Sequence, residues 1–308
     1  MQRPLLIVVG PTGTGKSSLA LHLAEQFGGE LVNADSVQLY RGFDIGSAKT
    51  PMAERRGIPH HLFDAQDAKT VPSAGDYGRA ARKVVEEISG RSRLPIVVGG
   101  TGFYIRALLD GLPALPARNE AVRERLTARE PGSLHRLLSR LEPAAASRIQ
   151  PEDTQKLIRA LEIRLLTKAP LPPAGSGDPL TGFDVLQLGL DPPREALVQA
   201  ITVRTKEIFA AGLLDEVRGL LASGLTGDEK PFESLGYKQA VAHLRGELEW
   251  EAAIESTEIG TRQYAKRQRT WFRRDARIHW LAGFGTDPGI QAEAVKLCRN
   301  RCNPSASC

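Results

Sequence analysis

Short apolar runs recur along the chain and alternate with longer segments of helical periodicity. The first run, Leu5–Val9, is too short and too rich in β-branched residues to be a helix, so it predicts a buried strand. Similar runs predict further strands at Glu30–Ala34, near His61–Phe63, and at Pro95–Val98, Val185–Leu190 and Ile278–Leu281. Helical patterns over Lys16–Phe27 and Asp76–Ile88 lie between these strands and are followed by glycines. The alternation predicts an α/β fold, with a parallel sheet flanked by helices on both faces.

The character of the sequence changes near Gly111. From Leu112 to about Lys168 no strand pattern occurs, and arginines recur among leucines and alanines, which predicts a mainly helical insertion. A loop rich in Pro and Gly follows it. We therefore divide the chain into residues 1–111 (first part of the sheet domain), 112–180 (helical insertion), 181–285 (second part, with basic C-terminal helices) and 286–308 (short helix and tail).

Composition narrows the class of protein without identifying it. The net charge of +5 is only weak evidence for a nucleic-acid partner. No apolar run approaches the roughly 18–20 residues that span a bilayer, and the N-terminal run is too short for a signal peptide, so we expect a cytoplasmic protein without membrane contact. The three cysteines, Cys298, Cys302 and Cys308, lie in the last eleven residues without a nearby histidine. We expect a loose tail of reduced thiols rather than a metal site.

The segment Gly10–Ser17 matches the phosphate-loop pattern G-x-x-x-x-G-K-[ST] between a predicted strand and a predicted helix. Its glycines let backbone N–H groups surround an anion, and the helix N-terminus adds its positive dipole end. Lys16 supplies a positive charge, and the Ser17 hydroxyl is the usual ligand of a Mg²⁺ ion on the phosphates. The expected pyrophosphate-binding residues are Gly10, Pro11, Thr12, Gly13, Thr14, Gly15, Lys16 and Ser17, with Ser17 as the metal ligand. The pattern does not say whether the ligand is ATP.

Two further strand ends should face this loop, because the carboxyl ends of parallel strands meet at one edge of a sheet. Asp35 follows one strand, and Thr101 lies in the glycine-rich segment after another. Asp35 could reach Mg²⁺ through water, could act as a general base, or could only cap the next turn. Thr101 offers a hydroxyl whose role, taken alone, is as compatible with structure as with catalysis.

Several further blocks of sequence are more specific than the phosphate loop. They are Asn33–Gly42, Asp44–Lys49, His60–Leu62, Val98–Gly102, Leu235–Gln239 and Arg262–Gln268, with Thr270 and Trp271 following. Together with the phosphate loop, and in this order, they resemble the tRNA dimethylallyltransferases from about residue 4 to residue 283. The blocks Asp35–Gln38 and Lys266–Gln268 carry most of the specificity. The resemblance implies a phosphate-loop NTPase-like fold.

The resemblance also implies a reaction. A dimethylallyl group would pass from dimethylallyl pyrophosphate to N6 of the adenosine immediately 3′ of the tRNA anticodon, giving N6-(dimethylallyl)adenosine. The phosphate loop would then hold a leaving group, whose growing negative charge Lys16 and Mg²⁺ on Ser17 would stabilise. Asp35 would accept the proton of the adenine amine, Thr101 would contact the substrates at the centre of the channel, and Arg204 would approach the pyrophosphate.

A flipped-out adenosine requires a surface that holds the surrounding RNA. The segment Arg262–Arg277 has helical periodicity and contains seven arginines or lysines and one acid, Asp275. Without the other motifs, we would interpret it as a solvated helix face. The resemblance adds a second surface on the insertion. The expected tRNA-binding residues are Asp35, Ser36, Val37, Gln38, Thr101, Arg123, Gln155, Lys156, Leu157, Ile158, Arg159, Gly236, Tyr237, Lys238, Lys266, Arg267, Gln268, Arg269, Thr270, Trp271, Phe272 and Arg273.

Three other functions share parts of this pattern. A phosphate-loop kinase of a small molecule would use the same loop, and the insertion could then be an ATP lid. An adenylate isopentenyltransferase acting on free AMP or ADP would need no large basic surface, so the Arg262–Arg277 cluster argues against it. An RNA-binding NTPase switch would not depend on Asp35. We expect a monomer that binds dimethylallyl pyrophosphate and the anticodon stem-loop of tRNA. We expect Mg²⁺ as its cofactor.

Overall fold

The computed structural model describes residues 2–173 and 175–302. The chain divides into two compact units, which we call the sheet unit (Met1–Leu109 with Pro179–Cys308) and the insertion unit (Asp110–Asp178). Each unit has its own hydrophobic core. No helix in the described ranges is long and apolar enough to cross a membrane.

Within the described residues, the sheet unit contains one sheet of six parallel strands in the order β3-β2-β4-β1-β5-β6. The strands are β1 (Arg3–Val9), β2 (Gly29–Asn33), β3 (His60–His61), β4 (Leu94–Val98), β5 (Phe183–Leu190) and β6 (Ile278–Leu281). The expected parallel α/β fold is confirmed. The prediction for the third strand was wrong in its bounds: Leu62 has a φ of 59°, and this left-handed backbone ends β3 before Phe63.

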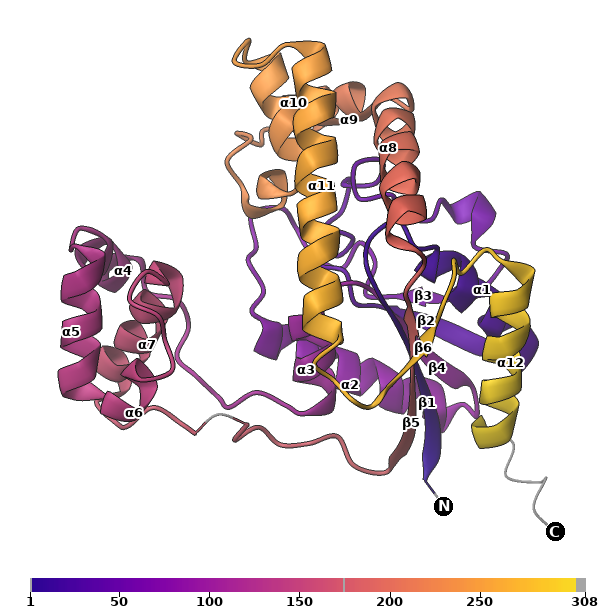
Figure 1. Ribbon diagram of the computed structural model, residues 1–308, viewed down its shortest axis with the longest axis horizontal. Helices are drawn as coiled ribbons and strands as arrows, with labels where there is room; N and C mark the ends of the chain where they lie inside the picture. The colour runs from indigo at the N-terminus through magenta and orange to yellow at the C-terminus, as the bar shows by residue number, and fades with distance from the viewer. Residues whose placement is uncertain (1, 174, 303–308) are drawn as a thin grey trace. The chain divides into compact units, whose positions relative to one another are not determined.

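Helices cover both faces of this sheet (Figure 1). Alternate β1 side chains explain why: Ile7 belongs to the core cluster on one face, and Leu6 belongs to the cluster on the other. The first face is covered by α2 (Ala74–Gly90) and α3 (Gly102–Leu109), and the second by α1 (Lys16–Phe27) and α12 (Pro288–Cys302). α2 begins two residues before the predicted Asp76, because Ser73 and Asp76 form a capping box.

A group of helices adjoins the carboxyl edge of the sheet and forms a third apolar cluster in the sheet unit. It contains α8 (Arg194–Ala210), α9 (Leu213–Ala222), α10 (Tyr237–Leu244) and the N-terminal part of α11 (Trp250–Phe272), with the 3₁₀ turn Lys230–Glu233. Another 3₁₀ turn spans Met52–Glu54. Figure 1 shows α11 running from this cluster down beside the ends of the strands. The long helix therefore connects the helical cluster with the edge where the phosphate loop lies.

The insertion unit consists of short helices around buried leucines, including Leu126, Leu134 and Leu138. Its helices are α4 (Glu120–Thr127), α5 (Pro131–Leu141), α6 (Pro143–Ala146) and α7 (Thr154–Thr167). Two of them begin at side-chain caps: Asn119 accepts the Val122 N–H at 3.0 Å, and Asp153 accepts the Lys156 N–H at 3.2 Å. The local sequence thus sets where these helices begin.

The expectation of a loose cysteine tail is wrong for Cys298. This residue lies on α12 and is fully buried in the core cluster on the α1 face of the sheet. Its thiol is therefore a packing group, because burial keeps it away from solvent. The side chain of Cys302 and the whole of Cys308 lie outside the described residues.

Candidate active site

The phosphate loop lies between β1 and α1, as its pattern requires. Gly13 and Gly15 have φ values of 81° and 78°, in the left-handed region that favours glycine, and α1 begins at Lys16 directly after them. At Gly10 the reason for glycine is space: a Cβ there would lie 2.7 Å from the carbonyl oxygen of Leu190 on β5. The loop is therefore shaped by its own glycines and by the neighbouring strand.

Lys16 lies at the positive end of α1, where burial disfavours its charged form. Its Nζ donates a hydrogen bond to the Pro11 carbonyl at 2.6 Å. Burial and, second to it, the positive charge of Arg204 together lower the pKa of Lys16 to about 7, against the opposing effect of the negative charge of Asp35. Without an anion in the loop, the lysine therefore loses its proton near neutral pH. A bound pyrophosphate would restore the charge.

Asp35 follows β2, and the structure shows one of the three roles that its sequence left open, the cap. Its Oδ1 accepts the Val37 N–H at 2.8 Å and, more weakly, the Gln38 N–H at 3.4 Å, so it does cap the next turn. Among the described residues its Oδ2 makes no hydrogen bond. Capping fixes the carboxylate and leaves one oxygen to accept a proton or a hydrogen bond from a ligand.

Thr101 joins the Asp35 turn to the end of β4. Its Oγ1 accepts the Ser36 N–H at 3.1 Å, and its own N–H donates to the Ala34 carbonyl at 3.1 Å. Thr101 therefore holds the segment that carries Asp35 in place.

A cavity of about 390 Å³ opens between these elements within the sheet unit. Thr12 and Gly13 of the phosphate loop line it together with Asp35, and Arg204 of α8 lines it as well. Its apolar lining consists of Val37, Ile201, Ile208 and Leu235. Of the residues predicted to be catalytic, Asp35 and Arg204 therefore share one cavity with the phosphate loop, and Lys16 and Thr101 adjoin it.

One face of α11 borders this cavity; sequence reasoning assigned Gln268 of this face to tRNA and left Thr257, Thr261 and Tyr264 out of the site. Thr257, Thr261 and Tyr264 line the cavity, and Gln268 follows on the same helical face. The phenol of Tyr264 is close to Asp35: burial and the aspartate charge raise the pKa of Tyr264 to about 12, opposed by a hydrogen bond with Thr101. Polar residues at spacings of four, three and four within a long helix were the signal that could have revealed this face.

Several cations of α11 are held in ion pairs, so fewer of them lack a partner than the composition of this helix suggests. The Arg269 Nε lies 2.7 Å from Oδ1 of Asp191, at the end of β5, and Arg273 pairs with the other oxygen of the same carboxylate. Arg262 pairs with Glu258, and Arg277 with Asp275. In the described part of the chain, the cations of this segment without an ion pair are Lys266, Arg267 and Arg274. They line a surface depression of about 480 Å³ beside Thr270 and the exposed Trp271.

Five of the residues expected to contact tRNA have buried side chains in this structure. Leu157 and Ile158 belong to the insertion core, Tyr237 to the helical cluster, and Phe272 to the core on the α2 face; Ile158 also lines the depression described below. Gln268 is also buried and hydrogen-bonds within the protein. Among the other predicted contacts, Ser36, Val37 and Gly236 line the cavity, Lys238 is exposed, and Gln38 donates to the Ser47 carbonyl at 3.0 Å.

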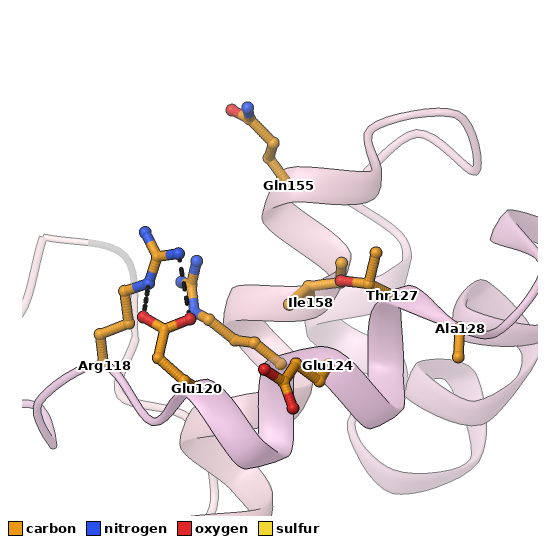
Figure 2. A pocket seen from close by; sticks show the side chains of 8 residues that line it. Arg118, Glu120, Glu124, Thr127, Ala128, Gln155 and Ile158 are labelled. Atoms are coloured by element: carbon orange, nitrogen blue, oxygen red, sulfur yellow. Dashed lines mark hydrogen bonds and ion pairs between the residues drawn. The ribbon is translucent and has the colours of Figure 1, made fainter. Parts of the chain in front are cut away.

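The insertion unit has its own surface depression of about 490 Å³, lined by the predicted tRNA contacts Arg123 and Gln155 (Figure 2). Arg118 and Glu120 form an ion pair at its edge. Behind it the fully buried Glu162 carboxylate binds Arg123 Nε at 3.1 Å and Arg159 Nη1 at 2.7 Å. These ion pairs hold both guanidinium groups in place and hold the pKa of Glu162 below its usual value, despite the opposing effect of burial. The neighbouring Lys156 pairs with Asp153.

Fold and site together define a phosphate-loop protein of the α/β class. Its polyphosphate loop opens onto a partly apolar cavity that contains a fixed carboxylate and a half-buried arginine. Burial lowers the pKa of that arginine, Arg204, so the site also favours an anion as its partner.

Comparison with known proteins identifies the family within this class. A model of the family described as IPP transferase matches residues 38–275. A tRNA dimethylallyltransferase of Solibacter usitatus is 53% identical over 297 residues, covering 95% of this chain and 97% of the relative. One of Koribacter versatilis is 50% identical over 307 residues, covering 97% of this chain and 99% of the relative.

Solved structures agree with these sequence relatives. The tRNA isopentenylpyrophosphate transferase of Staphylococcus epidermidis superposes with a TM-score of 0.70 at 31% identity, covering 97% of this chain and all of that one. A eukaryotic dimethylallyltransferase, described as acting on tRNA, gives a TM-score of 0.79 at 26% identity, covering 96% of this chain and 79% of that one. The chain belongs to the IPP transferase family.

Proposed function

We propose that this protein transfers the dimethylallyl group of dimethylallyl pyrophosphate to N6 of the adenosine immediately 3′ of the anticodon in tRNA. The observation that carries the proposal is the single cavity shared by the phosphate loop and Asp35, in a chain whose relatives are named for this reaction. A site for the leaving group and a proton acceptor in one chamber are what an alkyl transfer to an amine requires.

Different residues around the cavity perform different parts of the reaction. The amides of Gly10–Ser17, with Lys16 and Arg204, bind the pyrophosphate and stabilise the charge that grows as its bond to the allylic carbon breaks. The apolar lining receives the five-carbon group and excludes water from the allylic carbon. The amine nitrogen forms the new bond to that carbon and releases a proton, which Asp35 accepts while Thr101 holds its turn in place.

The residues present fit a Mg²⁺ ion at Ser17. Its hydroxyl lies at the first turn of α1 and, within residues 2–173 and 175–302, makes no hydrogen bond. Mg²⁺ is commonly held by one or two protein oxygens with phosphate oxygens and water, so a cluster of acidic ligands is not required. When bound, the ion would neutralise the charge of the pyrophosphate. Ser17 would hold it there.

The proposed RNA surface includes the exposed cations Lys266, Arg267 and Arg274 on α11, with Trp271 as an aromatic face for a base. The depression at Arg123 and Gln155 offers a second contact in the insertion unit. Because the cavity is lined by one chain, a monomer suffices for the reaction. With tRNA as its substrate, we place the enzyme in the cytoplasm.

The relatives favour this function over a small-molecule kinase and over an enzyme of free AMP or ADP. The test uses radiolabelled dimethylallyl pyrophosphate, Mg²⁺ and unmodified tRNA, and measures label in an anticodon-loop adenosine. We expect label in tRNA and none in AMP or ADP. Release of ADP from ATP with a small acceptor, and no labelled tRNA, would overturn the proposal.

Asp35→Asn tests the assigned base, because an amide oxygen can still cap Val37 but is too weak a base to accept the proton. We expect transfer to fall by about a thousandfold or more, with tRNA binding retained. The control is Asp215→Asn, the same exchange at an exposed position on α9. If Asp35→Asn transfers at the wild-type rate, Asp35 is not the base.

A further inference from the structure

The Gln268 side chain is turned into the protein, although its block resembles a tRNA-contacting motif. It is 5% exposed, and both of its polar atoms have partners inside the sheet unit. Its Oε1 accepts the backbone N–H of Thr12 at 2.8 Å, and its Nε2 donates to the Gly100 carbonyl at 2.9 Å. Because each polar atom is already hydrogen-bonded inside the protein and the side chain is buried, the amide is not presented to RNA.

The two partners of Gln268 belong to the two segments that form the active site. Thr12 is part of the phosphate loop and lines the cavity, and Gly100 directly precedes Thr101. The contact is close: a Cβ at Gly100 would collide with the Gln268 amide, which explains a glycine there. The side chain therefore bridges the segments after β1 and β4 from a position on α11.

The next turns of α11 are fixed to a third strand end. Arg269 and Arg273 both pair with Asp191, the residue after β5, which is 5% exposed at its side chain. These ion pairs determine where the helix lies against the sheet edge, and so where the Gln268 amide points. The helix end is held independently of any ligand.

We propose that Gln268 is a positioning residue of the phosphate loop rather than a tRNA contact. Its bond to Thr12 selects the loop conformation in which the remaining amides face a pyrophosphate, so binding needs no reorganisation. The inference rests on the proposed function for the identity of the bound pyrophosphate. It goes beyond that function by assigning a residue of the RNA-binding helix to the other substrate.

The test is Gln268→Met, which keeps the length of the side chain and removes both hydrogen bonds. We expect the dissociation constant of Mg²⁺-pyrophosphate, measured by calorimetry, to rise about tenfold or more, and the dissociation constant of tRNA at fixed salt to change less than about twofold. In steady-state transfer, KM for dimethylallyl pyrophosphate rises and KM for tRNA does not. The control is Gln26→Met, the same exchange at an exposed site on α1.

A second variant keeps the test decisive if Gln268→Met unfolds. Gln268→Glu retains an acceptor for Thr12 but places a negative charge beside the loop, so pyrophosphate binding weakens and tRNA binding stays the same. A loss of tRNA affinity with unchanged pyrophosphate affinity, in either variant, would overturn the proposal. A lower thermal midpoint with both affinities unchanged would also overturn it, because Gln268 would then be only structural. Absence of prenyl transfer by the wild type would instead refute the proposed function, since both binding arms are measured without transfer.

Discussion

Raising the pH should weaken the binding of dimethylallyl pyrophosphate, because Lys16 has lost its proton in the ligand-free site. The pKa of Lys16 is lowered to about 7 by burial and by Arg204. A polyanionic ligand beside its Nζ favours the charged form, so the pKa rises again on binding. A group whose pKa rises on binding takes up a proton. Affinity therefore falls as the pH rises above about 7, and it is independent of this lysine below that pH.

The size of the effect follows from the fraction of protonated lysine. About half of the Lys16 side chains carry a proton at pH 7 and about one in a hundred at pH 9, so the apparent dissociation constant rises roughly fiftyfold over this range. This holds while the pKa in the complex stays above about 9, near the ordinary value of a lysine. The change corresponds to about 2.3 kcal/mol of binding free energy.

Calorimetric titration with dimethylallyl pyrophosphate and fixed Mg²⁺, in two buffers of different ionisation enthalpy, measures both the affinity and the protons taken up. We expect uptake of close to one proton near pH 8. The matched variant is Lys16→Arg, whose guanidinium stays charged at every pH used. Its affinity is lower, because the fork does not fit a site built for an ammonium, but it should lack the lysine's contribution to the pH slope. Identical pH slopes for wild type and Lys16→Arg, or no proton uptake, would refute the reasoning.

Three further perturbations test other parts of the structure. Lys266→Ala combined with Arg274→Ala should weaken tRNA binding and reduce the slope of log affinity against log salt concentration by about two. The control Arg277→Ala, at a residue that pairs with Asp275, should leave that slope unchanged. If the double variant and the wild type have equal slopes in a salt titration, α11 is not part of the interface. Glu162→Ala should destabilise the insertion unit by about 3 kcal/mol, because it leaves two arginines without their buried partner. Hydrogen exchange should then show lower protection of the amides in residues 110–178 and unchanged protection elsewhere. Glu216→Ala should raise KM for dimethylallyl pyrophosphate about tenfold, because Glu216 accepts hydrogen bonds from the backbone N–H groups of residues 44–46, next to the cavity. An unchanged KM would contradict that role.

The sequence determined the sheet and the phosphate loop. The strands were predictable because central parallel strands are buried on both faces and read as short apolar runs, as at Leu5–Val9. The phosphate loop was predictable because its eight residues are contiguous and its glycines act through their own backbone. The positions of Asp35 and Thr101 followed from the rule that parallel strands end at one edge.

Only the tertiary structure decided which of the other polar residues are available to a ligand. Counting charges on α11 could not show that Arg273 is paired with a carboxylate 82 positions away, and a motif could not show that Gln268 reaches an amide 256 positions away. The same holds for Glu162, whose buried carboxylate pairs with Arg123 and Arg159, two of the expected RNA contacts. Local patterns specify backbone conformation, because it depends on neighbouring residues. Burial and pairing depend on residues distant in sequence, so the contacts of Gln268 with Thr12 and Gly100 could not be inferred from its motif.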